Sequence, residues 1–77
     1  MKIVYTRHAQ DRMIMRGISK DLVEECVQSP DRTMPGRNGK ILYLKDLGKN
    51  FLKVIVKQED STFLVITFHW LEKRRVK

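Results

Sequence analysis

The sequence predicts a single α+β domain over residues 1–77, with the order β-α-α-β-β-β and a helical hairpin packed on one face of an antiparallel sheet. Two observations predict this class. Apolar residues recur at helical spacing up to residue 29, whereas from residue 40 they alternate with polar ones, which is the period of a strand. Hydrophobic residues make up 42% of the chain, which is enough for a packed core. Helices that precede a run of antiparallel strands are typical of α+β domains.

The N-terminal part is predicted to form one strand and two helices. The stretch "KIVYT" is rich in β-branched and aromatic residues and indicates a strand at about residues 2–6. Thr6 can cap a helix over residues 7–16, and Gly17 is a natural end for it. Ser19 can cap a second helix, "SKDLVEECVQS", whose apolar residues lie on one side.

The rest of the chain is predicted to form three strands joined by short hairpins. The strands are "KILYLK" (40–45), "NFLKVIVK" (50–57) and "STFLVITFHW" (61–70). The connections "DLGK" and "QEDS" are short and polar enough for hairpin turns. A weaker signal at 32–34 leaves a further short strand open.

Alternation along the strands assigns residues to the two faces of the sheet. We expect the face beneath the helices to hold eight apolar residues: Leu42, Leu44, Leu52, Val54, Val56, Leu64, Ile66 and Phe68. We expect the opposite, open face to hold Ile41, Tyr43, Lys45, Lys49, Phe51, Lys53, Ile55, Lys57, Phe63, Val65, Thr67 and His69. A register slip of one residue reverses the assignment of a whole strand.

Positive charge is concentrated in the middle of the chain. The net charge is +7, and residues 30–58 alone hold seven basic and two acidic residues. Such a concentration is typical of a protein that binds a polyanion, nucleic acid first, although a solvated basic surface is the alternative. The single cysteine, Cys26, and the lack of a signal peptide or a membrane-spanning run predict a cytoplasmic protein with no membrane partner.

The open face is the predicted site of RNA binding and cleavage. Cleavage requires cations around the scissile phosphate and groups that transfer protons. The predicted catalytic residues are Lys53, His69 and Tyr43. The predicted nucleic-acid-binding residues are Arg37, Lys45, Lys57, Arg74 and Arg75. The chain has two scattered histidines and one cysteine, so we expect no metal site and no cofactor. The alternative is a face that another protein chain covers.

His8, Arg12 and Arg16 recur at a spacing of four residues, which places them on one face of the first helix. They either contact a ligand or, as we expect here, have a structural role, in which Arg12 or Arg16 reaches Glu24 and Glu25 of the second helix. The acidic character of that second helix excludes a helix-turn-helix DNA reader, because its recognition helix would be repelled by phosphate.

The pattern H-A-x-x-R-M-x-x-R-G-I-S, from His8 to Ser19, resembles a family of small bacterial and archaeal domains of unknown function. Later matches are Gly36-Arg37, Tyr43, "LKVIV" and "VITF". The element order is also similar to the RelE/ParE-like toxin fold, in which a helical hairpin backs an antiparallel sheet.

That second resemblance implies a toxin that binds RNA or the ribosome, and in its boldest form a metal-independent mRNA endoribonuclease. It also implies a small acidic antitoxin protein as a partner, and leaves a homodimer open. Other members of the superfamily poison DNA gyrase. A non-catalytic protein-interaction module of the same fold is the remaining alternative, because a fold does not fix a function.

Overall fold

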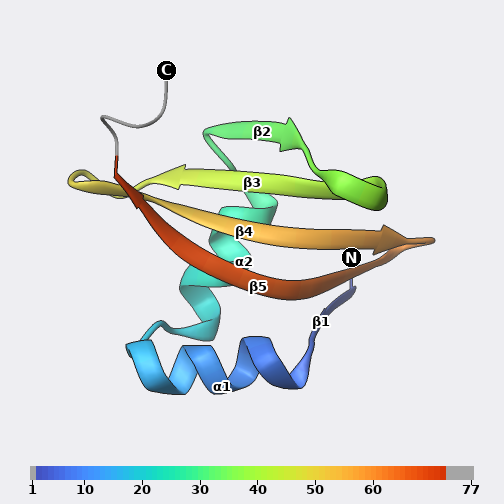
Figure 1. The fold of residues 1–77 in the computed structure, drawn as a ribbon, viewed down its shortest axis with the longest axis horizontal. Coiled ribbons are helices and arrows are strands. Elements are labelled where there is room, and N and C mark those ends of the chain that lie inside the picture. The colour runs from blue at the N-terminus through green and yellow to red at the C-terminus, as the bar shows by residue number, and fades with distance from the viewer. Residues whose placement is uncertain (1, 73–77) are drawn as a thin grey trace.

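A computed structural model describes residues 2–72, which form two helices and five strands (Figure 1). In chain order the elements are β1 (Lys2–Tyr5), α1 (Arg7–Arg16), α2 (Lys20–Gln28), β2 (Arg32–Pro35), a 3-10 turn η1 (Arg37–Gly39), β3 (Lys40–Asp46), β4 (Asn50–Glu59) and β5 (Thr62–Glu72). The predicted α+β class is confirmed. The weakly indicated strand is also present, as β2.

The strands form one mixed sheet in the order β1-β5-β4-β3-β2. Four of them are antiparallel to their neighbours, as predicted, but β1 pairs with β5 in parallel, with Lys2 opposite Thr62 and Tyr5 opposite Val65. The prediction of a purely antiparallel sheet is therefore wrong. The reason is that β1 and β5 are joined by all the rest of the chain and not by a hairpin, so their connection does not require them to be antiparallel.

The residues predicted to cap the two helices do so. The Thr6 hydroxyl accepts a hydrogen bond of 3.1 Å from the Ala9 amide, and the Ser19 hydroxyl accepts one of 3.1 Å from the Leu22 amide. Gly17 ends α1 in the left-handed region, at a φ of 63°, where glycine avoids the steric penalty of a side chain. Neither helix of the described residues is long and apolar enough to span a membrane.

Helix α2 packs against one face of the sheet and crosses behind the central strands in Figure 1, while α1 lies along the β5 edge and adds Ala9 to the same core. The core between them consists of Ala9, Ile18, Val23, Cys26, Val27, Tyr43, Leu52, Val54, Val56, Val65 and Phe68. Burial of this apolar surface is the main favourable contribution to folding. The other face of the sheet, which carries no helix, is the open face.

The face assignment predicted for β4 is correct, but that for β3 is wrong. Tyr43 lies opposite Val54 in the register of β3 and β4, so it faces the helices, whereas Leu42 and Leu44 lie opposite Ile55 and Lys53 on the open face. The side chain of Tyr43 is only 8% exposed. Alternation within a strand does not fix its register with the next strand across a turn. The turn after β3 shifts the pairing of β3 with β4 by one residue from the expected pairing.

A β-bulge explains the remaining error, in the first half of β5. Ile55 lies opposite Thr67, but the next residue, Val56, lies opposite Val65, which leaves Ile66 as an extra residue in β5. The bulge reverses the alternation, so Phe63 and Val65 face the core instead of the open face. Leu64 pairs with Lys57 and consequently lies on the open face. After the bulge, Thr67, Phe68 and His69 occupy the predicted faces.

Candidate nucleic-acid interface

Lys53 and His69 form a cross-strand pair at the centre of the open face. They are register partners on β4 and β5, and both side chains are half-buried. Side chains of directly opposite residues on one face have Cβ atoms roughly 5 Å apart. The antiparallel pairing of two long strands therefore holds an ammonium group and an imidazole side by side, as the alternation predicted.

Helix α1 adds a second set of cationic side chains to this pair. β1 pairs only with residues 62–65 of β5, so the later part of β5 has no strand on that side, and α1 lies there instead (Figure 1). The Thr6 hydroxyl fixes the start of α1, since it donates a hydrogen bond of 2.9 Å to the carbonyl of Ile66. The residues His8, Arg12 and Arg16, which we call the α1 stripe, thus lie beside the open face and close to His69.

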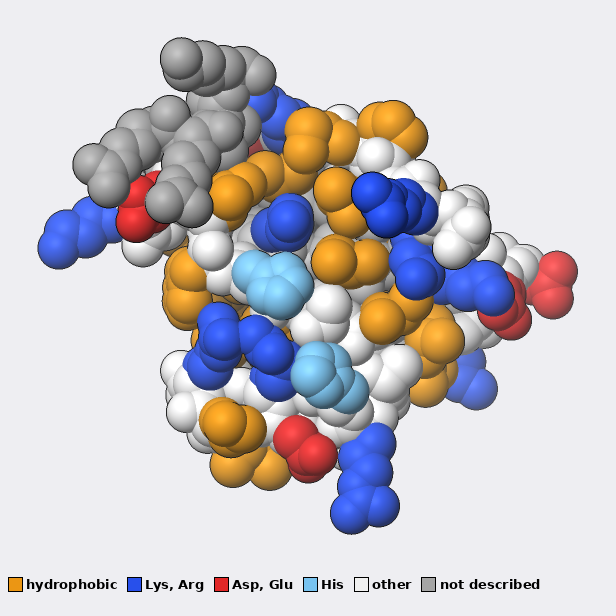
Figure 2. Space-filling model, viewed as in Figure 1, with side chains coloured by type: hydrophobic (Ala, Val, Ile, Leu, Met, Phe, Trp, Pro, Cys, Tyr) orange, Lys and Arg blue, Asp and Glu red, His pale blue; other side chains and the backbone are white. Residues whose placement is uncertain are grey.

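The positive charges of the α1 stripe and of Lys53 both act on His69. The pKa of His69 is lowered, first by burial, then by the positive charge of Lys53, and then by Arg12, Arg16 and His8. Burial and like charges both disfavour the imidazolium ion. Figure 2 shows both histidines of the protein on this face, with Lys and Arg side chains around them. The lowered pKa of His69 therefore favours the neutral imidazole among several cationic side chains.

Two polar atoms at this place are buried without a hydrogen-bond partner in the described part of the chain. They are Nε of Arg12 and Oγ1 of Thr67. Buried polar atoms in proteins are almost always hydrogen bonded, so each exception calls for an explanation. Here they lie on the two elements, α1 and β5, that carry the cationic cluster.

The α1 stripe corrects one expectation from the sequence. Within residues 2–72, neither Arg12 nor Arg16 forms an ion pair with Glu24 or Glu25. Glu24 instead accepts a hydrogen bond of 2.8 Å from the hydroxyl of Tyr5. The physical reason is the placement of α1 beside β5, which directs the stripe to the open face and away from α2.

Two other predicted site residues lie on the wrong side of the sheet. Tyr43 is in the core, where its ring stacks on Phe63 with the ring centroids 6.4 Å apart. Lys45 lies opposite the core residue Leu52, and its ammonium group donates a hydrogen bond of 2.9 Å to the carbonyl of Ser29 at the end of α2. Both positions follow from the shifted register of β3.

The remaining predicted residues are dispersed. Lys57 lies on the open face, but its ammonium group is 3.4 Å from a carboxylate oxygen of Glu59, and both side chains are well exposed. Arg37 lies in η1, at the far side of the sheet from α1. Arg74 and Arg75 lie outside the described residues.

A groove of about 560 Å³ lies beside Lys53, on the opposite side from His69. We call it the η1 groove, and its lining residues are Pro35, Gly36, Arg37, Lys40, Leu42, Lys53 and Ile55. Three of these side chains are cationic and none is acidic, while the others are apolar or lack a side chain. The sequence pattern drew attention to Gly36-Arg37 but gave no reason to expect a groove.

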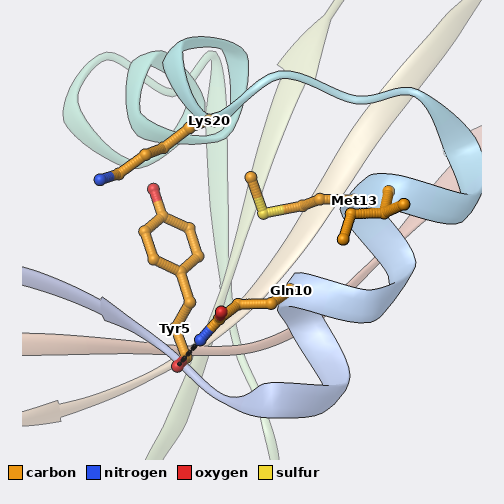
Figure 3. A pocket seen from close by; sticks show the side chains of 5 residues that line it. Tyr5, Gln10, Met13 and Lys20 are labelled. Atoms are coloured by element: carbon orange, nitrogen blue, oxygen red, sulfur yellow. Dashed lines mark hydrogen bonds between the residues drawn. The ribbon is translucent and has the colours of Figure 1, made fainter.

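A second hollow, of about 400 Å³, lies between β1 and the two helices, on the helical side of the molecule (Figure 3). Tyr5 and Met13 point into it, and the side-chain amide of Gln10 donates a hydrogen bond of 3.2 Å to the Tyr5 carbonyl. Lys20 lies over the Tyr5 ring, with its ammonium group 5.7 Å from the ring centroid. This hollow therefore resembles a gap in the packing, with a cation–π contact between Lys20 and Tyr5 at its rim.

The cluster brings together residues that the sequence treated separately. Lys53 and His69 were assigned to the site, whereas the α1 stripe was assigned a structural role. These residues come together because β1 is shorter than β5 and leaves room for α1 beside the later part of β5. This difference in length has an effect only when the two strands are paired, so the sequence alone does not reveal it. In residues 2–72, no group of three or more His, Cys, Asp or Glu side chains could hold a metal ion.

Comparison with known proteins gives one match. Residues 5–69 match the model of a family described as a domain of unknown function, DUF4258. The matched range contains the whole cationic cluster and the η1 groove. No curated protein and no solved structure matches the chain.

Proposed function

The chain belongs to the DUF4258 family of domains of unknown function, and from the geometry of its site we propose that it binds RNA and cleaves it. The observation that carries the proposal is the convergence of the α1 stripe with Lys53 on a half-buried His69 whose pKa is lowered. An imidazole that stays neutral among several fixed cations suits proton transfer next to a phosphate.

The cations supply binding and charge stabilisation. Arg12 and Arg16 present guanidinium groups, which bind phosphate oxygens in a bidentate manner. Lys53 adds a point charge at the centre of the face, beside His69. In the transition state of phosphoryl transfer, negative charge grows on the phosphate oxygens, and preorganised cations lower its energy.

The proposed reaction uses the ribose 2′-hydroxyl of the RNA as the nucleophile. Neutral His69 accepts the 2′-hydroxyl proton while the 2′-oxygen forms a bond to the adjacent phosphorus. The bond from phosphorus to the 5′-oxygen of the next nucleotide breaks, and that oxygen takes up a proton from the solvent, to which His69 then returns the proton that it accepted. The products are a 2′,3′-cyclic phosphate and a 5′-hydroxyl, and no group outside the protein and the RNA is consumed.

We extend this proposal to a toxin of the RelE/ParE type. The order of two helices followed by antiparallel strands supports the likeness. The substrate is then mRNA, free or on the ribosome, and the expected partner is a small acidic antitoxin that neutralises the same cations.

Incubation of the purified protein with an end-labelled RNA of mixed sequence tests the proposal. We expect cleavage in the presence of EDTA, products that end in a 2′,3′-cyclic phosphate, and resistance of a 2′-deoxy substrate. Lys53→Ala and His69→Asn are expected to lower the rate by at least tenfold, because each removes a group that acts on the transition state.

Lys20→Ala is the matched control, because it removes one positive charge from α2 on the helical side. It is expected to cleave as the wild type does. RNA that stays intact with a folded wild-type protein, or equal activity of Lys53→Ala and Lys20→Ala, would overturn the cleavage proposal. Growth arrest on expression without new RNA 5′ ends would direct the search to a protein target such as gyrase.

A further inference from the structure

We propose that the η1 groove is a nucleotide-binding subsite that holds the base and phosphate next to the scissile bond. This inference rests on the proposed function, because it names where the same RNA strand continues beyond the cationic cluster. Apart from Lys53, it concerns residues to which the cleavage step assigns no role.

The backbone around Gly36 builds the groove. The Gly36 amide donates a hydrogen bond of 2.8 Å to the Lys40 carbonyl, which folds η1 back onto the start of β3. A Cβ atom at position 36 would come within 3.1 Å of that carbonyl oxygen and 3.4 Å of Leu42 Cδ2. A larger residue would therefore displace the Lys40 backbone by a few tenths of an ångström, and the closed turn places Arg37 and Lys40 beside the groove.

The lining has the two chemistries that a nucleotide requires. Leu42 and Ile55 are register partners on β3 and β4, so they form one apolar patch on the open face. Bases that leave a stack are held by aromatic or apolar side chains. Arg37, Lys40 and Lys53 supply positive charge around this patch, which suits the phosphate of the same nucleotide.

The position of the groove fits the next nucleotide of a cleaved strand. Lys53 lines the groove and is also the register partner of His69, so the two sites meet at this residue. β4 lies between β5 and β3 in the sheet. Neighbouring strands are about 4.8 Å apart, so the groove is one to two strand spacings from His69. Its volume of about 560 Å³ is within the usual range of about 300–1,000 Å³ for small-ligand pockets.

Binding of an uncleavable RNA tests the subsite separately from cleavage. The probe is a fluorescein-labelled octanucleotide with 2′-O-methyl groups throughout, and its Kd is measured by anisotropy at several salt concentrations. Arg37→Ala is expected to weaken binding about tenfold. It is also expected to lower the slope of log Kd against log salt by about 0.7, as for one lost phosphate contact on a single strand.

An abasic scan tests the base contact. We expect the wild type to bind several-fold more weakly when one particular position of the octanucleotide lacks its base. Ile55→Thr keeps a β-branched residue in β4 and should lose this dependence on position. Lys20→Ala and Val4→Thr are the matched controls for charge and for apolar surface, and both should bind as the wild type does. Gly36→Ala, which displaces the turn, should resemble Arg37→Ala.

The outcomes separate the subsite from the cleavage reaction. Binding that depends on Arg37 and Ile55 supports the subsite even when the natural RNA stays intact, in which case only the cleavage proposal fails. Equal binding by Arg37→Ala and Lys20→Ala overturns the subsite and leaves cleavage standing. An equal loss at every abasic position overturns the base contact, and a folded wild type that binds no RNA overturns both proposals.

Discussion

The hydroxyl of Thr6 donates a hydrogen bond of 2.9 Å to the carbonyl of Ile66, the extra residue of the bulge in β5. The same hydroxyl accepts a hydrogen bond from the Ala9 amide and so caps α1. The Thr6 amide also donates to the Val65 carbonyl, at 3.0 Å. One residue therefore satisfies the bulge, begins the helix and sets the position of the α1 stripe relative to His69.

We expect Thr6→Val to lower the free energy of unfolding by about 1–2 kcal/mol, because the valine keeps the shape of the side chain but loses the cap and the bond to Ile66. Urea unfolding followed by circular dichroism measures the change. Thr6→Ser retains the hydroxyl and should lose much less stability. A Thr6→Val protein as stable as Thr6→Ser would mean that the hydroxyl does not hold α1 on β5.

The titration of His69 tests the cationic cluster directly. Its pKa is lowered by burial and by the positive charge of Lys53 and the α1 stripe. NMR titration of the imidazole should therefore give a midpoint below the usual value of about 6.5. Lys53→Met removes one of the charges and should raise that midpoint, whereas Lys20→Met should leave it unchanged. A wild-type midpoint at or above 6.5 would contradict the clustering.

The same shift makes the stability of the fold depend on pH. The unfolded chain binds a proton at residue 69 more readily than the folded chain does, since the pKa of His69 is lowered on folding. Its contribution is fully present above about pH 6.5 and is lost as the pH falls through the lower folded-state value. Thermal melts of the wild type and His69→Asn should therefore diverge below pH 6.5, with the wild type losing more stability. Parallel curves would argue against this shift.

Substitutions of Tyr43 distinguish the position predicted from the sequence, on the open face, from the position in the structure, in the core. Because its side chain is in the core and stacks on Phe63, Tyr43→Phe should leave RNA cleavage and binding unchanged. Tyr43→Ala should lower the free energy of unfolding by roughly 3 kcal/mol, as for other large-to-small aromatic changes in cores. A stable Tyr43→Phe protein with a large loss of cleavage rate would show that the hydroxyl acts on the substrate.

Cys26 should be inert in the folded protein. It is fully buried, and its thiol donates to the carbonyls of Tyr43 and Leu52, at 3.5 and 3.6 Å. Burial raises its pKa to about 12, so the reactive thiolate is scarce at neutral pH. As it is the single cysteine of the chain, iodoacetamide labelling should track global unfolding as urea is added. Fast labelling in native buffer would indicate that α2 opens locally from β3 and β4.

Local rules of the sequence determined the elements of this protein. Thr6, Ser19 and Gly17 begin and end the helices because capping depends on a few neighbouring residues. The alternation of "NFLKVIVK" placed Lys53 on the open face because the period of a strand is also local. These rules were enough to predict the α+β class, and to predict that Lys53 and His69 lie on the same face of the sheet.

Tertiary structure decided what depends on pairing between distant segments. The parallel contact of β1, the register of β3 and the bulge at Ile66 each follow from how strands meet, which alternation cannot specify. The register of β3 moved Tyr43 and Lys45 off the open face. The short contact of β1 left the later part of the β5 edge free for α1, and so brought the α1 stripe to His69. The sequence by itself determined which basic and titratable side chains lie on each strand and helix, and packing of the chain decided which of them stand together.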